Sequence, residues 1–286
     1  MQKLLFVPPV RIAAVLLALY SMKAGAQNPP TVPSAAPQPA AVASLNDTLL
    51  AKATARYAST AKSGLHSFDC SVHPDWETIE TSSRKGAPMA GGDSEIALLN
   101  KVKITLHARL DGDSTVDWAV LAGKPVDAAA SAMLDRAHRG IEQTLTGALK
   151  LWVPLINGSV AESLGAEDGY VAQTENGYSV RSRDKRHSLR EEFDRNLLLT
   201  RYVIADSGSV VDIAPTFRQT NLGLLLSGFT ALVHPADSTT EKAQEMRIAV
   251  EYQVVSGAQI PARLAVEVPN VVTMDFALDG CTVNVK

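Results

Sequence analysis

The sequence has little cysteine, few aromatic residues and no long apolar run. Cysteine occurs only twice in 286 residues, at Cys70 and Cys281, and aromatic residues make up 5% of the chain. Two cysteines are too few for a small disulfide scaffold or a four-cysteine zinc site. The apolar run at residues 12–20 is about nine residues long, whereas a transmembrane helix needs about 20. We therefore expect no transmembrane segment in the mature chain.

Recognisable catalytic motifs are also missing. The sequence contains neither the G-x-S-x-G nucleophile turn nor the H-E-x-x-H zinc motif, and Gly91-Gly92 lacks the lysine of a phosphate-binding loop. These absences predict a protein that is not an enzyme and has no catalytic residue, metal or cofactor. Acid/base chemistry by paired carboxylates stays open, because such pairs assemble in space and leave no trace in the sequence.

The first 44 residues predict export. Lys3 and Arg11 precede the apolar run, and Ala24-Gly25-Ala26 follows it, which is the order of a secretory signal peptide over residues 1–26. Five prolines in residues 27–44 indicate an extended, disordered spacer. No cysteine lies near the cleavage site, so no lipid anchor is expected. The protein is then periplasmic or extracellular, with a single domain over residues 45–286.

The charge balance argues against polyanionic partners. The 27 basic and 30 acidic residues give a net charge of −3, and removing the three basic residues of the leader makes it −6. An acidic chain is a poor partner for nucleic acid or anionic membranes. Residues 181–195 hold six basic and four acidic side chains. We interpret them as a solvated hairpin with cross-strand ion pairs around Asp184-Lys185.

The two cysteines are predicted to form a disulfide. In an oxidising compartment a lone pair of exported cysteines usually bridges, and Cys70–Cys281 would close a loop of about 210 residues. Two buried free thiols are the alternative. A metal site from His66, Asp69, Cys70 and His73 is disfavoured, because on a strand these residues divide between opposite faces.

Helical spacing appears in two segments. Residues 44–63 predict a helix ended by Gly64, and residues 127–149 predict a long amphipathic helix ended by Pro154. We place His138 on the wet side of this helix and expect a loop over residues 84–94. The apolar stripe of the long helix can pack as core or cover a cavity as a lid; it contains Met133, Ala137, Ile141, Leu145 and Leu149.

The remaining pattern is nearly all strand. Alternating apolar and polar residues predict strands at 65–72, 101–110, 116–120, 170–173, 178–183, 188–193, 197–205, 210–217, 222–233, 246–255, 260–268 and 271–278. Short turn signals separate many of them, at Asp111-Gly112-Asp113, Asn176-Gly177, Asp206-Ser207-Gly208, Ser256-Gly257 and Asp279-Gly280. The predicted fold class is α+β: a large curved antiparallel β-sheet, an incomplete barrel, with one or two amphipathic helices packed on its apolar face.

Part of the strand series resembles a known family. The stretch from Tyr178 through Phe193-Asp194, Asp206-Ser207-Gly208-Ser209 and Gly223-Leu224-Leu225-Leu226 to Leu264 is similar in strand order to periplasmic lipoprotein-localisation carriers (LolA/LolB-like). The similarity covers about 110 residues and involves no invariant motif. The resemblance implies a half-barrel that holds acyl chains of lipids or lipoproteins, although this chain lacks the acylated cysteine of the anchored members.

Two functional hypotheses follow. The first is an exported soluble binding protein that carries a lipid, another hydrophobic ligand or a lipoprotein acyl chain; the side chains expected to line its cavity are Met133, Ile141, Leu145, Leu224, Leu226, Val250 and Leu264. The second is a non-catalytic envelope scaffold or interaction module, whose partner is an envelope protein and whose barrel is filled. Large inward side chains that fill the barrel favour the second hypothesis, and a void favours the first.

Overall fold

The structure is a computed structural model. It describes residues 48–49, 51–53, 55–58, 63–83, 92–110, 114–121, 127–156, 170–183, 188–206, 208–235 and 243–285. The predicted leader (1–26), the predicted spacer (27–44), the Asp111-Gly112-Asp113 turn and the Asp184-Lys185 pair lie outside these residues. No helix among the described residues is both long enough and apolar enough to span a membrane.

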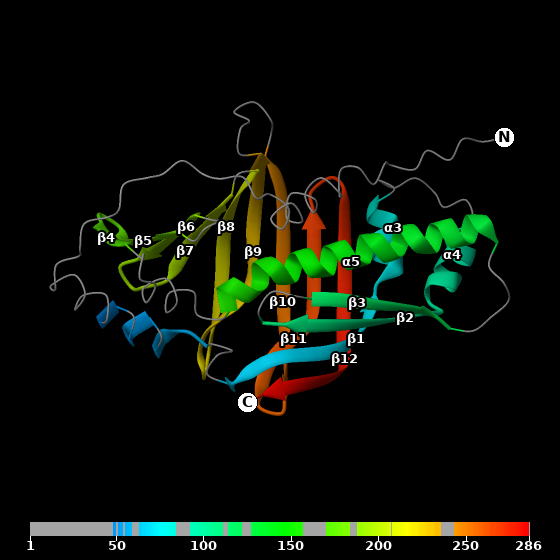
Figure 1. Ribbon diagram of the computed structural model, residues 1–286, viewed down its shortest axis with the longest axis horizontal. Coiled ribbons are helices and arrows are strands. Elements are labelled where there is room, and N and C mark those ends of the chain that lie inside the picture. Colours follow the sequence, from blue (N-terminus) through cyan, green and yellow to red (C-terminus); the bar gives the residue numbers. More distant parts are fainter. Residues whose placement is uncertain are drawn as a thin grey trace. The chain divides into compact units, whose positions relative to one another are not determined.

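The predicted α+β class is confirmed. Twelve described strands form an antiparallel sheet that is not closed into a barrel, and the described helices are few (Figure 1). The chain divides into two compact units. The described part of unit 1 comes from Thr60–Pro154 and Glu245–Lys286, and that of unit 2 from Ala18–Ser59 and Leu155–Gln244. Each unit is described by itself.

Unit 1 contains the N-terminal and C-terminal strands of the sheet. Its strands lie in the order β3-β2-β1-β12-β11-β10 and pair antiparallel. Alternation fixes their faces: on β10, Met246, Ile248 and Val250 are buried while Arg247 and Glu251 are exposed. The strand bounds are β1 Leu65–Pro74, β2 Val102–Arg109, β3 Ser114–Val120, β10 Gln244–Val255, β11 Ala258–Val268 and β12 Val272–Val285.

The long helix α5 (Ala128–Ile156) packs its apolar stripe on the sheet of unit 1 (Figure 1). Asp127 caps its first turn, accepting a hydrogen bond from the Ala130 amide at 2.8 Å. Near its other end, Trp152 meets Phe68 of β1 edge to face, with ring centroids 6.2 Å apart. This ring contact and the burial of Ile141, Leu145 and Leu149 make the predicted amphipathic helix part of the core.

Helix α5 is longer than predicted. Pro154 lies inside its last turn, and the helix ends at Ile156, seven residues beyond the expected end at Leu149. Proline removes one hydrogen bond and disfavours a helix interior. Here the helix continues because the residues on either side of Pro154 bury large apolar side chains, including Val153, Leu155 and Ile156. Burial of this order, worth about 1.5–3 kcal/mol per side chain, outweighs the cost of a proline near a helix end.

Neither of the two short helices of unit 1 was predicted from the sequence. Helix α3 (Trp76–Ser83) precedes the predicted loop at 84–94. Helix α4 (Gly92–Leu99) includes the last three residues of that predicted loop. Asp75 caps α3 by accepting from the Thr78 amide at 3.0 Å, and this hydrogen bond lowers the pKa of Asp75. The Thr273 amide of β12 donates to the Ser82 hydroxyl at 2.9 Å, which fixes α3 to the sheet.

Unit 2 contains the other half of the strands, in the order β9-β8-β7-β6-β5-β4. Neighbours are again antiparallel. The predicted Asn176-Gly177 turn joins β4 to β5, and Gly177 has a positive φ of 153° there. The bounds are β4 Tyr170–Thr174, β5 Gly177–Arg183, β6 Ser188–Asp194, β7 Leu199–Ala205, β8 Ser209–Thr220 and β9 Gly223–Pro235.

The N-terminal helical segment of unit 2 ends earlier than predicted. Helical residues occur between 48 and 56, and Tyr57 instead forms a parallel bridge with Leu224 of β9. Gly223 allows this approach: its φ is +116°, and a Cβ there would lie 2.5 Å from the Arg56 carbonyl oxygen. The buried Tyr57 ring also meets Phe217 edge to face at 5.2 Å. Tertiary packing of Tyr57 thus stops the helix seven residues before Gly64.

Candidate functional site

The side chains predicted to line an apolar cavity are mostly core residues. In unit 1, Leu145 and Leu264 have no exposed surface, and Ile141 and Val250 are 2% and 3% exposed. In unit 2, Leu226 is 2% and Leu224 8% exposed. Met133 alone is half-buried, near the start of α5. A side chain without accessible surface does not line a space that admits even a water molecule, so at these positions the interior is filled.

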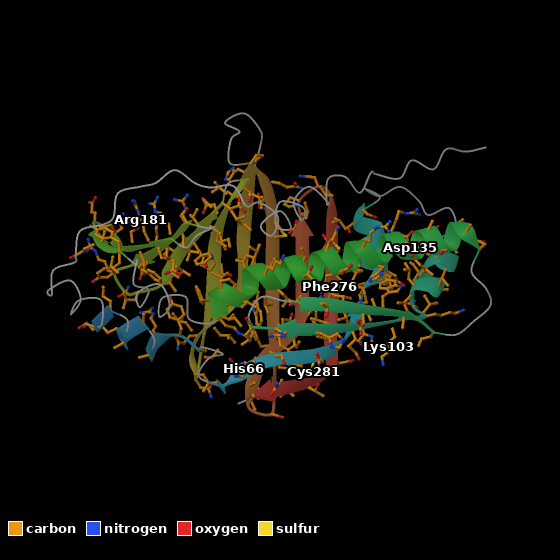
Figure 2. The ribbon with its side chains drawn as sticks, in the orientation of Figure 1. His66, Lys103, Asp135, Arg181, Phe276 and Cys281 are labelled. Atoms are coloured by element: carbon orange, nitrogen blue, oxygen red, sulfur yellow. A yellow bond between two sulfur atoms is a disulfide. The ribbon has the colours of Figure 1, made fainter. Side chains whose placement is uncertain are left out.

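The interior of unit 1 is closed by large aromatic side chains as well. Trp152 of α5 has no exposed surface, and neither has Phe276 of β12, which is labelled in Figure 2. The Trp152 indole N–H donates to the Tyr252 hydroxyl at 3.0 Å, so its one polar atom is satisfied. The Thr144 hydroxyl donates to the Gly140 carbonyl at 2.7 Å and lies 3.4 Å from Met274 Sδ. The helix–sheet interface of unit 1 is therefore a packed core at these contacts.

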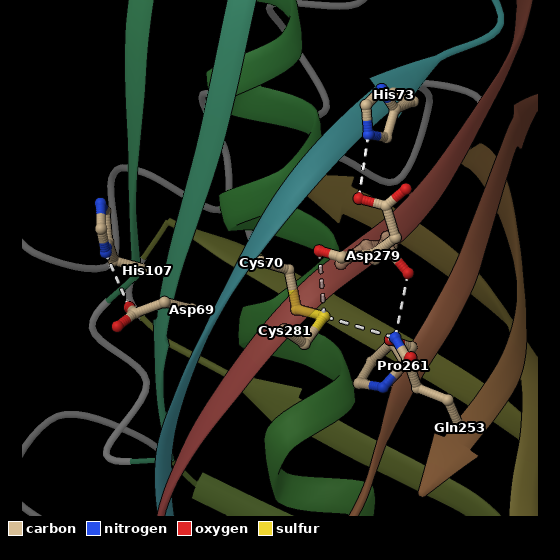
Figure 3. Close-up of a disulfide and its surroundings, with 9 residues drawn as sticks. Asp69, Cys70, His73, His107, Gln253, Pro261, Asp279 and Cys281 are labelled. Atoms are coloured by element: carbon tan, nitrogen blue, oxygen red, sulfur yellow. Dashed lines mark hydrogen bonds and ion pairs between the residues drawn. A yellow bond between two sulfur atoms is a disulfide. The ribbon is translucent and has the colours of Figure 1, made fainter. Parts of the chain in front are cut away.

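The predicted disulfide is confirmed. Cys70 of β1 and Cys281 of β12 have sulfur atoms 2.08 Å apart and Cα atoms 4.2 Å apart (Figure 3). Because β1 and β12 are neighbours, the bridge joins adjacent strands although 211 residues separate its cysteines. The alternative of two free thiols is excluded, and Cys70 has no thiolate to offer a metal.

The turn predicted at Asp279-Gly280 is wrong, because both residues lie inside β12. Asp69 pairs with Thr282 and Ser71 with Asp279, so Gly280 and Cys281 together face Cys70. Two residues opposite one define a β-bulge, and Gly280 at φ +55° supplies the left-handed conformation that such a bulge needs. The bulge brings Cys281 to the face on which Cys70 lies.

Polar side chains surround the disulfide (Figure 3). The side-chain amide of Gln253 donates to the carbonyl oxygens of Leu278 at 2.9 Å and Pro261 at 3.1 Å, and to Cys281 Sγ at 3.3 Å. His73 lies 3.0 Å from the Asp279 carboxylate. These contacts hold the bulged segment of β12 in place.

The residues considered for a metal site interact with separate partners instead of converging on one point. His107 Nδ1 lies 2.7 Å from Asp69, and its Nε2 lies 3.2 Å from Asp117. The hydrogen bond with Asp69, followed by that with Asp117, raises the pKa of His107. His73 pairs with Asp279, and no group of three or more ligand side chains converges in the described part of the chain.

A cleft of about 400 Å³ lies on the other unit, over strands β4 to β7. Tyr170, Arg181, Arg190 and Val203 line it, together with Ser182, Ser188 and Leu189 of the paired strands β5 and β6. Figure 2 shows Arg181 in this part of unit 2. The volume is within the range of small-molecule sites, roughly 300–1,000 Å³. We take this cleft as a candidate binding site.

The charged hairpin is the only part of this cleft that the sequence singled out. The strands β5 and β6 pair as expected. Glu192 of β6 forms ion pairs with Arg190 on its own strand and, at 3.8 Å, with Arg201 of the next strand, β7. Arg201 also makes a two-point contact with Asp212, which raises the pKa of Arg201. The direct opposition of Arg181 and Arg190 was missed, because it depends on the register set by the hairpin.

Comparison with known proteins finds no matching family model, no matching curated protein and no matching solved structure. The class that the fold defines is an α+β protein with an antiparallel sheet and a disulfide between neighbouring strands. The resemblance to lipoprotein-localisation carriers stays a prediction.

Proposed function

We propose that the protein is an exported, non-catalytic interaction module whose sheet is a packed scaffold. The main support is that residues predicted to line a cavity are buried: Leu145 and Leu264 have no exposed surface, and Leu226 is 2% exposed. A carrier of acyl chains needs an apolar space of a few hundred cubic ångströms. Filled positions on both α5 and the sheet therefore favour the module over the carrier of lipid or lipoprotein acyl chains.

Three further observations support this proposal. The disulfide is compatible with export to an oxidising compartment, either periplasm or medium. Both ring nitrogens of His107 are occupied by carboxylates, so this histidine has no free nitrogen to activate a nucleophile. No helix in the described part of the chain is long and apolar enough to cross a membrane. The partner we propose is another envelope protein.

Native mass spectrometry with lipid extraction tests the proposal. The full chain is expressed with its leader, collected from the exported fraction and weighed under native conditions. We expect a polypeptide that begins after Ala26, contains one disulfide and carries no lipid. One bound lipid per chain would overturn the module and restore the carrier.

A designed cavity provides the positive control. Leu264→Ala removes a fully buried side chain of β11 and should destabilise unit 1 by about 2–5 kcal/mol. If the wild-type interior is filled, a fluorescent fatty-acid probe should bind this variant better than the wild type. In a carrier, the wild type would already bind the probe, and enlarging the cavity would change little.

A further inference from the structure

A row of four residues crosses the cleft of unit 2. Tyr170 pairs with Arg181, Arg181 with Arg190, and Arg190 with Val203, so that the row runs from β4 to β7. Directly opposed residues in antiparallel strands project to the same face. All four line the cleft, and the two arginines therefore share one surface with an aromatic residue on one side and an aliphatic residue on the other.

The two arginines are not equally neutralised. Arg190 forms an ion pair with Glu192 on its own strand. Arg181, which is exposed, has no carboxylate within ion-pair distance among the described residues. Like charges directly opposite each other on a sheet are destabilising. Arg181 thus places a second positive charge directly beside the Arg190–Glu192 ion pair, and an anion bound at Arg181 would offset that charge.

The chemistry of the lining restricts the anion. A guanidinium group presents planar, parallel N–H donors that fit the two oxygens of a carboxylate or phosphate. Tyr170, at the end of the row, is an aromatic residue that is 59% exposed. From this row we propose that the cleft binds an organic oxyanion: a carboxylate or phosphate carried on an aromatic or aliphatic group. The inference goes beyond the proposed module and does not depend on the packed core.

Calorimetric titration of the full exported chain tests the site with defined probes. Phenyl phosphate and phenylacetate represent the two oxyanions, inorganic phosphate lacks the ring, and benzyl alcohol lacks the charge. We expect at least one organic anion to bind with 1:1 saturation, at least tenfold more tightly than inorganic phosphate. Benzyl alcohol should not bind. Comparing the two organic anions distinguishes a phosphate site from a carboxylate site, and failure of both to saturate would overturn the proposal.

Variants distinguish binding in this cleft from nonspecific attraction of an anion to any exposed arginine. Arg181→Gln should weaken the organic anion at least tenfold, whereas Arg139→Gln, which removes an exposed arginine of α5 outside the cleft, should change affinity less than twofold. Tyr170→Ser should weaken phenyl phosphate and leave inorganic phosphate unchanged. Equal losses in Arg181→Gln and Arg139→Gln would refute the site.

Folding can be controlled in the same experiment. Arg181→Gln relieves a like-charge pair, so its melting temperature should equal or exceed that of the wild type. Arg181→Lys keeps the charge without the planar donors and should bind with intermediate affinity. Amide shifts on titration should centre on residues 170, 181, 190 and 203; shifts centred elsewhere would contradict the assignment. Lipid found by native mass spectrometry would reject the module and leave this result intact.

Discussion

The side-chain amide of Gln253 donates a hydrogen bond to Cys281 Sγ across 3.3 Å. The same nitrogen also reaches the carbonyl oxygens of Pro261 on β11 and Leu278 on β12. One side chain of β10 thus satisfies backbone groups of two other strands beside the disulfide. This places a polar support directly against the covalent link between β1 and β12.

Replacing Gln253 should destabilise unit 1 with the disulfide intact. Gln253→Met keeps the length of the side chain but leaves two carbonyl oxygens without this donor, at a cost of about 1–3 kcal/mol. Urea unfolding without reductant measures the change. Gln173→Met, at the exposed end of β4, should alter stability by less than about 0.5 kcal/mol. Equal effects of the two changes would contradict the supporting role of Gln253.

Loss of the disulfide should lower stability substantially. For the 211-residue separation of Cys70 and Cys281, chain entropy sets an upper limit of roughly 5 kcal/mol. We expect the paired change Cys70→Ser with Cys281→Ser to lower the melting temperature without abolishing export. Dithiothreitol should lower the melting temperature of the wild type and leave the double variant unchanged. A reductant effect on the double variant would mean that the agent acts elsewhere.

His107 should titrate above its ordinary pKa of about 6.5. The hydrogen bond to Asp69, and to a smaller extent that to Asp117, favours the protonated form of His107. The pKa of His107 is therefore higher in the folded than in the unfolded chain. The contribution of His107 to the free energy of unfolding is fully present at pH values below its pKa in the unfolded chain. It is lost as the pH rises through the pKa of His107 in the folded chain. Because the His107 side chain is 39% exposed, we expect less than about 1 kcal/mol.

NMR of the His107 ring measures this titration directly. Asp69→Asn should lower the midpoint more than Asp117→Asn, because Asp69 makes the larger contribution. His107→Gln should remove the corresponding pH dependence of unfolding. A midpoint at or below 6.5 in the wild type would show that the carboxylates do not stabilise the imidazolium.

His138 does not lie on the wet side of its helix. Its ring stacks on Trp118 of β3, with centroids 5.1 Å apart, and its Nε2 is buried without a hydrogen-bond partner among the described residues. His138→Phe should keep the stacking and remove the unsatisfied nitrogen, raising stability by about 1 kcal/mol. His138→Ser should lower stability, and chemical denaturation compares the two. A less stable Phe variant would indicate that Nε2 has a partner in solution.

Tyr57 should hold the strained turn before β7. Its buried hydroxyl donates to the Leu197 carbonyl at 2.8 Å and accepts from the Leu199 amide at 2.7 Å, while burial raises the pKa of Tyr57 to about 12. Leu197 has a φ of 60°, which is uncommon for leucine. Tyr57→Phe should cost about 1–3 kcal/mol and increase hydrogen exchange at the Leu199 amide. Unchanged exchange there would refute the role of the hydroxyl.

The sequence by itself determined the twelve strands, the antiparallel class, the long helix and the Cys70–Cys281 pairing. The alternation of apolar and polar residues indicates which face of a strand is buried, and with only two cysteines just one intramolecular disulfide can form. Tertiary structure decided the rest. Because apolar residues around Pro154 are buried, α5 continues beyond this proline. A β-bulge at Gly280 takes the place of the predicted turn. The N-terminal helix ends before Tyr57 because Tyr57 pairs with Leu224. Strand register alone set Arg181 against Arg190, because periodicity within a strand carries no information about its neighbour.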